Sequence, residues 1–151
     1  MIEFKERGIL IFSKISSENN LYLKFLTQKD EIITGLSFGG STKKKKNIFQ
    51  IGYFLNIVVK SKNKNFPNSI SAELSKPYYH NIFNDKYKLH ALLTLVSLLN
   101  ISIIEGQKVS GLFNLSENII EILANEKKWI INYFIFLLNL LKLIGYDIDY
   151  Q

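Results

Sequence analysis

The sequence is short of the residues on which much enzyme and metal chemistry depends. Its 151 residues contain no cysteine, which excludes disulfides, thiolate nucleophiles and thiolate metal sites together. Only two histidines are present, His80 and His90, so a metal site built from histidines is nearly excluded as well. Neither is obviously paired with a carboxylate in the sequence, and both are expected to be ordinary surface or core residues. We therefore expect no metal and no cofactor.

Catalytic patterns are also missing. The close pairs of acidic residues are Glu3/Glu6, Asp30/Glu31 and Asp147/Asp149. None of these pairs lies beside a histidine or a glycine-rich turn of recognised geometry. The glycines at 35, 39 and 40 lack the spacing and the Lys-Ser/Thr ending of a phosphate-binding loop. The residues support binding rather than catalysis, and we expect the protein not to be an enzyme.

Positive charge is confined to the first half of the chain. Lys and Arg outnumber Asp and Glu by 19 to 13, a net charge of +6. Residues 1–75 hold twelve basic and six acidic residues, whereas residues 76–151 hold seven of each. This distribution is expected when one half meets a polyanion and the other does not. Because lysine is frequent throughout, the asymmetry is a stronger argument than the total.

Residues 1–75 have the pattern of short strands. The length of 151 residues fits one ordinary domain or two small ones, and the 47% of hydrophobic residues is enough to bury a core. In this half they gather in segments expected to be extended: 8–15, 21–27, 31–38, 49–60 and 70–74. Residues 39–47 predict a loop, and the polar stretch 61–68 predicts a break in the sheet. Five short strands in this length suggest a small closed barrel, because closure removes exposed edges.

After Pro77 the apolar residues follow a helical period. Asn84 is expected to cap a first helix, a second is predicted through 112–122, and a third runs from about 126 to 144 and ends at Gly145. The expected buried stripe of the first helix is Leu89, Leu92, Leu93, Val96 and Leu99. The predicted fold class is α+β and multidomain, with a five-stranded OB-fold barrel at 1–75 and an α-helical domain at 76–151.

The third predicted helix is very apolar. Trp129 to Ile144 is sixteen residues, and a membrane span needs roughly 20 with few polar interruptions. Its polar residues fall in one narrow stripe, which is usual for the central helix of a bundle. We therefore expect a core helix rather than the alternative, a membrane span. Ile135 falls within the polar stripe, so it is expected to be an exposed apolar residue.

Lysine clusters are the strongest candidates for a binding site. The first is a run of four, Lys43, Lys44, Lys45 and Lys46, which follows paired glycines. It would form a cationic arm able to neutralise phosphates, although a solvated loop is the alternative. Lys60, Lys62 and Lys64 form a second basic loop after the next predicted strand. Two such loops flanking one barrel resemble those that grip single strands in OB folds, so nucleic-acid binding is favoured.

Aromatic residues near these loops are candidate stacking platforms for unpaired bases. Tyr22, Phe38 and Tyr53 lie on or beside predicted strands. Most aromatics at such spacing belong to the core. We rank Tyr22 and Tyr53 first, because a hydroxyl makes partial exposure less costly.

The order of these features resembles a known family. The strand Gly8–Leu10 precedes the turn at Ser17–Asn19, and a segment of glycines followed by lysines spans Gly35–Lys46. Gln50–Gly52 lies at the position where members of that family often have a Gln-Pro pair. Trp129–Tyr150 ends in Leu-Ile-Gly-Tyr-Asp-Ile-Asp, similar to a helix ending in Leu-Gly-aromatic-x-hydrophobic-Asp. Together these motifs resemble the bacterial DNA recombination and repair protein RecO, over the OB fold and part of the helical domain.

The resemblance implies a function as well as a fold. RecO proteins bind single- and double-stranded DNA, anneal complementary strands and load recombinase onto DNA covered by single-strand-binding protein, working with RecR and often RecF. The DNA contact carried over by the resemblance is Lys43–Lys46, and a cytoplasmic, nucleoid-associated protein is expected. Family members usually continue further and often carry a zinc-binding Cys cluster, whereas this sequence stops at Gln151 and has no cysteine. A natural short form, a fragment and one domain pair of a longer product all remain open.

Two other classes of function remain open. One is a protein-interaction module that uses the apolar helical half and has little affinity for DNA. The other is a membrane-associated protein that inserts the segment 129–144. The first predicts a stable complex with a partner such as RecR, and the second predicts partition into the membrane fraction.

Overall fold

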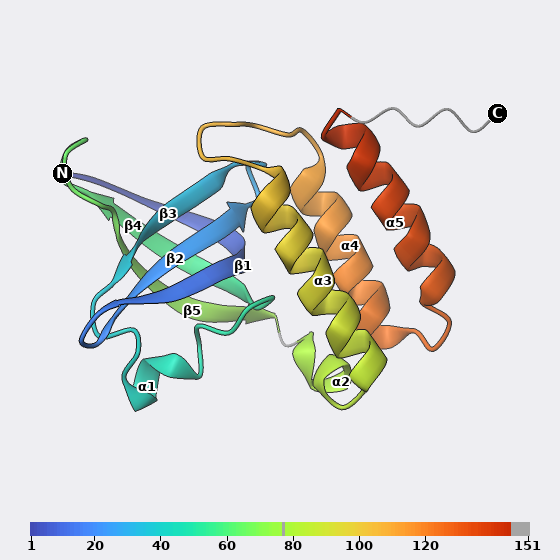
Figure 1. The fold of residues 1–151 in the computed structure, drawn as a ribbon. Helices are drawn as coiled ribbons and strands as arrows, with labels where there is room; N and C mark the ends of the chain where they lie inside the picture. The colour runs from blue at the N-terminus through green and yellow to red at the C-terminus, as the bar shows by residue number, and fades with distance from the viewer. Residues whose placement is uncertain (77, 146–151) are drawn as a thin grey trace.

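The computed structural model describes residues 1–76 and 78–145, and in these residues it combines a β-barrel with a set of helices. Figure 1 shows the barrel on one side and helices α2 to α5 on the other. The elements are β1 (Ile2–Ser17), β2 (Asn20–Thr27), β3 (Ile32–Ser37), α1 (Lys43–Lys46), β4 (Phe54–Ser61), β5 (Ser69–Lys76), α2 (Tyr79–Phe83), α3 (Lys86–Ser102), α4 (Leu112–Asn125) and α5 (Ile130–Leu143). The predicted α+β class is confirmed.

The strands close into an OB-like barrel in the order β1-β2-β3-β5-β4. Strand β1 is long enough to pair with β4 along its first half and with β2 along its second. The strand predicted from residue 49 begins at Phe54 instead, because the chain first turns at Gly52, whose φ is 87°. Phe49 nevertheless stays buried in the barrel core.

The barrel closes at Gly35. Strands β3 and β5 meet through a single parallel register pair, Leu36 with Ser69. The Leu36 amide donates to the Asn68 carbonyl at 2.8 Å, and the Asn68 side-chain amide donates to the Thr34 carbonyl at 3.0 Å. A Cβ at position 35 would lie 2.7 Å from that Asn68 carbonyl oxygen, so only glycine allows this approach.

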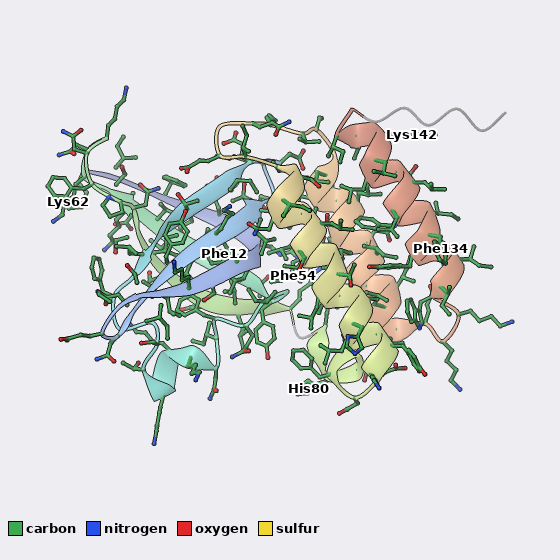
Figure 2. The ribbon with its side chains drawn as sticks, in the orientation of Figure 1. Phe12, Phe54, Lys62, His80, Phe134 and Lys142 are labelled. Atoms are coloured by element: carbon green, nitrogen blue, oxygen red, sulfur yellow. The ribbon has the colours of Figure 1, made fainter. Side chains whose placement is uncertain are left out.

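Apolar side chains on one outer face of the barrel join it to the helices. Ile9, Leu26 and Phe54 are fully buried and belong to the same apolar cluster as α3 and α4. Figure 2 labels Phe54 where the barrel meets the helices. The other face of the same strands points into the barrel and forms its own cluster. The helices therefore cover only part of the barrel and leave the rest of its outer surface open.

A polar clamp reinforces this junction. Asp30, in the β2–β3 turn, adopts a φ of 62°, and its carboxylate accepts hydrogen bonds from the Gly111 and Phe113 amides, both at 2.8 Å. These amides lie at the beginning of α4, where the helix dipole favours an acidic group. Arg7 on β1 also forms an ion pair with Glu117 of α4.

The first long helix begins later than the sequence predicted, and its burial differs. Its cap is Asp85, whose carboxylate accepts from the Tyr87 and Lys88 amides, and not Asn84, which ends the short helix α2. Leu93, expected in the buried stripe, is 41% exposed, and Leu95 is fully buried instead. The predicted stripe of buried residues was wrong at Leu93 because α3 packs against the barrel as well as against α2 and α4, so its buried surface is not a single stripe.

The prediction that the last helix is a core helix is wrong. Helix α5 is the element farthest from the barrel in Figure 1, and it buries only Tyr133, Phe136 and Leu140. The Tyr133 hydroxyl donates to the Ala91 carbonyl at 2.8 Å, and burial raises the pKa of this phenol. Ile135 is half exposed, as predicted. In the described part of the chain, no helix combines the length and the apolar character required to cross a bilayer.

Candidate nucleic-acid interface

The lysine run forms one turn of helix rather than the predicted loop. Helix α1 (Lys43–Lys46) forms because the Thr42 carbonyl accepts hydrogen bonds from the Lys45 and Lys46 amides at 3.0 and 2.8 Å. A single turn is not stable alone, and the buried Phe49 anchors the segment that follows it.

Three of the four lysines in this run have described side chains, and all three are exposed. The side chains of Lys43, Lys45 and Lys46 are exposed, as a phosphate contact requires. Lys44 contributes its backbone to the helical turn, which corrects the predicted loop at this position too. The Lys44 side chain lies outside the described part of the structure, so its predicted DNA contact stays a prediction.

Hydrogen bonds place α1 beside the tip of the β1–β2 hairpin. The Gly39 amide donates to the Asn20 side-chain oxygen at 3.0 Å, and the Ser41 amide donates to the Asn19 carbonyl at 3.0 Å. Asn19 and Asn20 form the turn and the first residue of β2. The lysines of α1 are therefore held near the hairpin and not on a freely moving arm.

Acidic partners separate the basic side chains of the barrel into two groups. The ion pairs are Arg7–Glu117, Lys29–Glu6, Lys60–Glu3 and Lys76–Glu117. The hydrogen bond from Lys29 to Glu6 raises the pKa of this lysine and keeps its charge engaged within the protein. Within residues 1–76 and 78–145, the lysines at 43, 45, 46, 62 and 64 make no ion pair, so their charges remain available to an anion.

The second basic loop is smaller than predicted. Lys60 belongs to strand β4, where it lies opposite Glu3 of β1 with 3.7 Å between the charged groups. Both side chains are about half exposed, so the pair is weak but reduces the charge that Lys60 offers. The loop between β4 and β5 keeps Lys62 and Lys64, both exposed. Figure 2 shows Lys62 at the end of the barrel away from the helices.

Tyr53 is not available as a stacking platform. It is only 9% exposed, belongs to the apolar core of the barrel, and lies 6.1 Å from the Phe83 ring. The prediction for this residue was wrong because Tyr53 follows the turn at Gly52 and directs its ring inward. Tyr22, the other candidate, is half-buried on the outer face of β2, opposite Lys14 of β1.

Two exposed phenylalanines lie within the basic loops. Phe38 is 58% exposed, and its carbonyl accepts a hydrogen bond from the Lys45 ammonium at 3.0 Å. Phe66 is 59% exposed in the loop that carries Lys62 and Lys64. Such rings beside unpaired cations are typical of single-strand binders. Phe38 was weighed from the sequence and ranked too low, whereas Phe66 was missed; its position before Pro67 in a polar loop was the signal.

The β1–β2 face also holds a hollow of about 440 Å³. It is lined by Phe12, Lys14, Ile15, Ser16 and Tyr22. The rings of Phe12 and Tyr22 are 6.2 Å apart and nearly perpendicular, and the Lys24 ammonium lies 5.8 Å from the Phe12 ring centre. This combination of aromatic rings and ammonium groups is suited to a flat, anionic ligand.

A larger hollow of about 550 Å³ lies over β1, β4 and β5 but has a different chemistry. No aromatic side chain lines it, and its basic residues, Lys5 and Arg7, are balanced by the acids Glu6 and Glu73. A surface without net charge or stacking rings does not attract a nucleic-acid strand. The lysine-rich loops and the aromatic hollow are therefore the better candidate site.

Two comparisons with known proteins find RecO sequences that are similar to this chain. Residues 84–151 match the family model described as "Recombination protein O C terminal". The chain is 26% identical over 148 residues to the DNA repair protein RecO of Rickettsia canadensis, covering 98% of this chain. The chain is similar to this RecO over nearly its whole length. RecO of Rickettsia bellii is 26% identical over 149 residues, and RecO of Dinoroseobacter shibae is 22% identical over 149 residues, each covering 99% of this chain.

The match to RecO covers the two halves of the chain differently. The family model begins at Asn84 and so covers α3 to α5, whereas the barrel is matched through the individual RecO relatives. The chain spans about three fifths of the length of these relatives, 61% of RecO from Rickettsia canadensis. The chain has no cysteine, and its described residues bring together no group of three or more His, Asp or Glu that could hold a metal ion.

Proposed function

We propose that this chain is a DNA repair and recombination mediator of the RecO type that binds and anneals single-stranded DNA. The observation that carries the proposal is the placement of exposed, unpaired lysines beside exposed aromatic rings on one barrel. The Lys45 ammonium donates a hydrogen bond to the backbone carbonyl of Phe38, and Lys62, Lys64 and Phe66 share the β4–β5 loop. Phosphates would meet the ammonium groups, and bases would stack on the rings.

The relatives support the biological setting of this chemistry. Those named above are DNA repair proteins, so a role in repair and recombination is the natural proposal. We include double-stranded DNA as a weaker ligand. The proposed partners during loading of recombinase are RecR, RecF and single-strand-binding protein. The proposed role is non-enzymatic, needs no cofactor, and belongs to the cytoplasm, in association with the nucleoid.

Strand annealing tests this function. Two complementary labelled oligonucleotides should form duplex faster with the protein than without it, because bound lysines reduce the repulsion between the phosphate backbones. The measurement is energy transfer between the labels over time. A pair of non-complementary strands controls for aggregation. A duplex-formation rate that stays the same at every protein concentration would contradict the proposal.

A second candidate function rests on helix α5. This helix exposes Ile131 by 75% and Phe134 by 61%, and Figure 2 shows Phe134 on its outer side, away from the other helices. Neighbouring apolar residues on the same helix are also exposed: Ile130, Ile135, Leu138 and Leu143. Contiguous apolar surface of this kind usually marks a site of protein interaction. We propose RecR as the partner to test first.

Replacing Ile131 and Phe134 with serine should weaken binding to RecR at least tenfold and leave DNA affinity unchanged. The expected loss follows from the energy that buried aromatic and aliphatic anchors supply at interfaces. Isothermal titration calorimetry with RecR measures it. The matched control replaces Tyr87 and Ile101 of α3 with serine, because these residues are 74% and 76% exposed on another helix. Equal RecR affinity for both variants would exclude the α5 face.

A further inference from the structure

Strand β1 is built so that Phe12 faces outward. Leu10 points into the barrel, and a register shift between Leu10 and Phe12 interrupts the pairing of β1 with β2. After the shift, Phe12 pairs with Lys24 and Lys14 pairs with Tyr22, so these side chains share the outer face. A β-bulge commonly re-aims a side chain beside a functional site.

The helices leave this part of the sheet uncovered. Nearer the junction, the outward residues Ile9, Ile11 and Leu26 are buried in the cluster that includes α3 and α4. Farther along the same strands, Phe12 and Tyr22 are only half-buried and border the 440 Å³ hollow. Figure 2 labels Phe12 on the barrel, beyond the region that α3 covers. The rings of Phe12 and Tyr22 are therefore accessible, although their neighbours on the same strands are buried against the helices.

From these observations we propose that the hollow is a stacking site for one unpaired nucleobase, which gives the protein a preference for single strands over duplex. The inference rests on the proposed function and adds the site that selects the strand. Because the two rings are nearly perpendicular and Lys24 lies over the Phe12 ring, the base stacks on the Tyr22 face with the Phe12 ring beside its edge. The Lys14 and Lys24 ammonium groups meet the flanking phosphates. In a duplex both faces of a base are already stacked, so a paired base cannot enter.

The position of α1 gives the strand a continuous path. Asn20, which accepts the Gly39 amide, is two residues before Tyr22, so α1 and the hollow are neighbours on the hairpin. A backbone that crosses the α1 lysines can deliver its next base to the hollow. Lysines alone would bind single and double strands by charge, whereas the hollow distinguishes them.

An abasic oligonucleotide tests the stacking site without changing the phosphates. The wild-type protein is titrated with labelled oligothymidine and with the same backbone carrying abasic sugars at alternate positions. Stacking predicts roughly five- to a hundredfold weaker binding of the abasic strand. A variant with Phe12→Leu and Tyr22→Leu should lose most of this difference and keep the same salt dependence. Tyr87→Leu on α3, an exposed aromatic residue outside both proposed binding surfaces, is the matched control and should behave as wild type.

The outcomes separate this inference from the proposed function. Equal binding of both strands by the wild-type protein, with a clear salt dependence, overturns the stacking site but leaves DNA binding intact. No binding of either strand overturns both. The comparison of strands uses only the wild-type protein, so equal binding would overturn the stacking site even if the Leu variant fails to fold. Thermal unfolding of the variant identifies that case.

Discussion

Replacing Lys43, Lys44, Lys45 and Lys46 with glutamine is expected to weaken binding of single-stranded DNA roughly 25- to 600-fold near 0.1 M salt, if two to four of these lysines contact phosphates. Each lost contact should also reduce the slope of log affinity against log salt by about 0.7. The physical reason is that the exposed lysines of this turn have no acidic partner in the described residues, so bound phosphates release counterions. Fluorescence anisotropy over a salt series measures both quantities.

The helical half offers a control with the same change in charge. Four exposed lysines of this half, at 86, 127, 128 and 142, can be replaced with glutamine together. The replacement removes the same number of positive charges from residues that are distant in sequence from α1. This control should lower affinity only slightly through the net charge and leave the salt slope unchanged. Equal losses in the two variants would mean that total charge, and not the α1 surface, binds DNA.

The second large effect is expected at the barrel closure. Gly35→Ala should destabilise the protein by about 1–3 kcal/mol, because a new Cβ would lie 2.7 Å from both the Asn68 carbonyl and the Ile70 side chain. One of these contacts is backbone, so a side-chain rotation cannot relieve it. Chemical denaturation followed by circular dichroism measures the change in the free energy of unfolding.

A second glycine provides the comparison. At Gly8 of β1, a Cβ would lie 3.2 Å from the Leu26 carbonyl and 3.3 Å from the Phe25 side chain, a tighter contact than usual but one that small shifts relieve. Gly8→Ala should therefore cost clearly less than Gly35→Ala. Gly35→Ala should also weaken DNA binding, because Asn68 ends the loop that carries Lys62 and Lys64. A Gly35→Ala protein as stable as wild type would show that the closure is adaptable.

The strands of the barrel could be predicted from the sequence because their cause is local. Apolar residues gather in short segments separated by polar turns. This pattern is enough to predict strands, whose side chains point alternately to the two faces of a sheet. The end of the last helix at Gly145 could be predicted for the same reason, because a glycine there readily adopts the observed φ of 99°. These predictions needed no knowledge of which elements meet.

The errors occurred where distant residues decide the structure. Asp30 holds the beginning of α4 through partners more than eighty residues away, which no local pattern reveals. Whether Tyr53 faces inward depends on the turn at Gly52 and on the packing of Phe83. For α5, the apolar composition correctly indicated a helix, but the composition cannot show whether a neighbour covers each face. Exposure of Phe38 required the three-dimensional structure for the same reason, whereas the position of Phe66 before Pro67 in a polar loop already indicated its exposure.

The most direct measurement of the central claim is the salt dependence of the wild-type protein for a labelled single-stranded oligonucleotide. The proposed barrel surface predicts binding at low salt and a log–log slope of magnitude between about two and six, from contacts by the unpaired lysines at 0.7 each and neighbouring cations. Binding to duplex of the same length should be weaker. Absence of binding even at low salt would contradict the account and direct attention to the exposed face of α5.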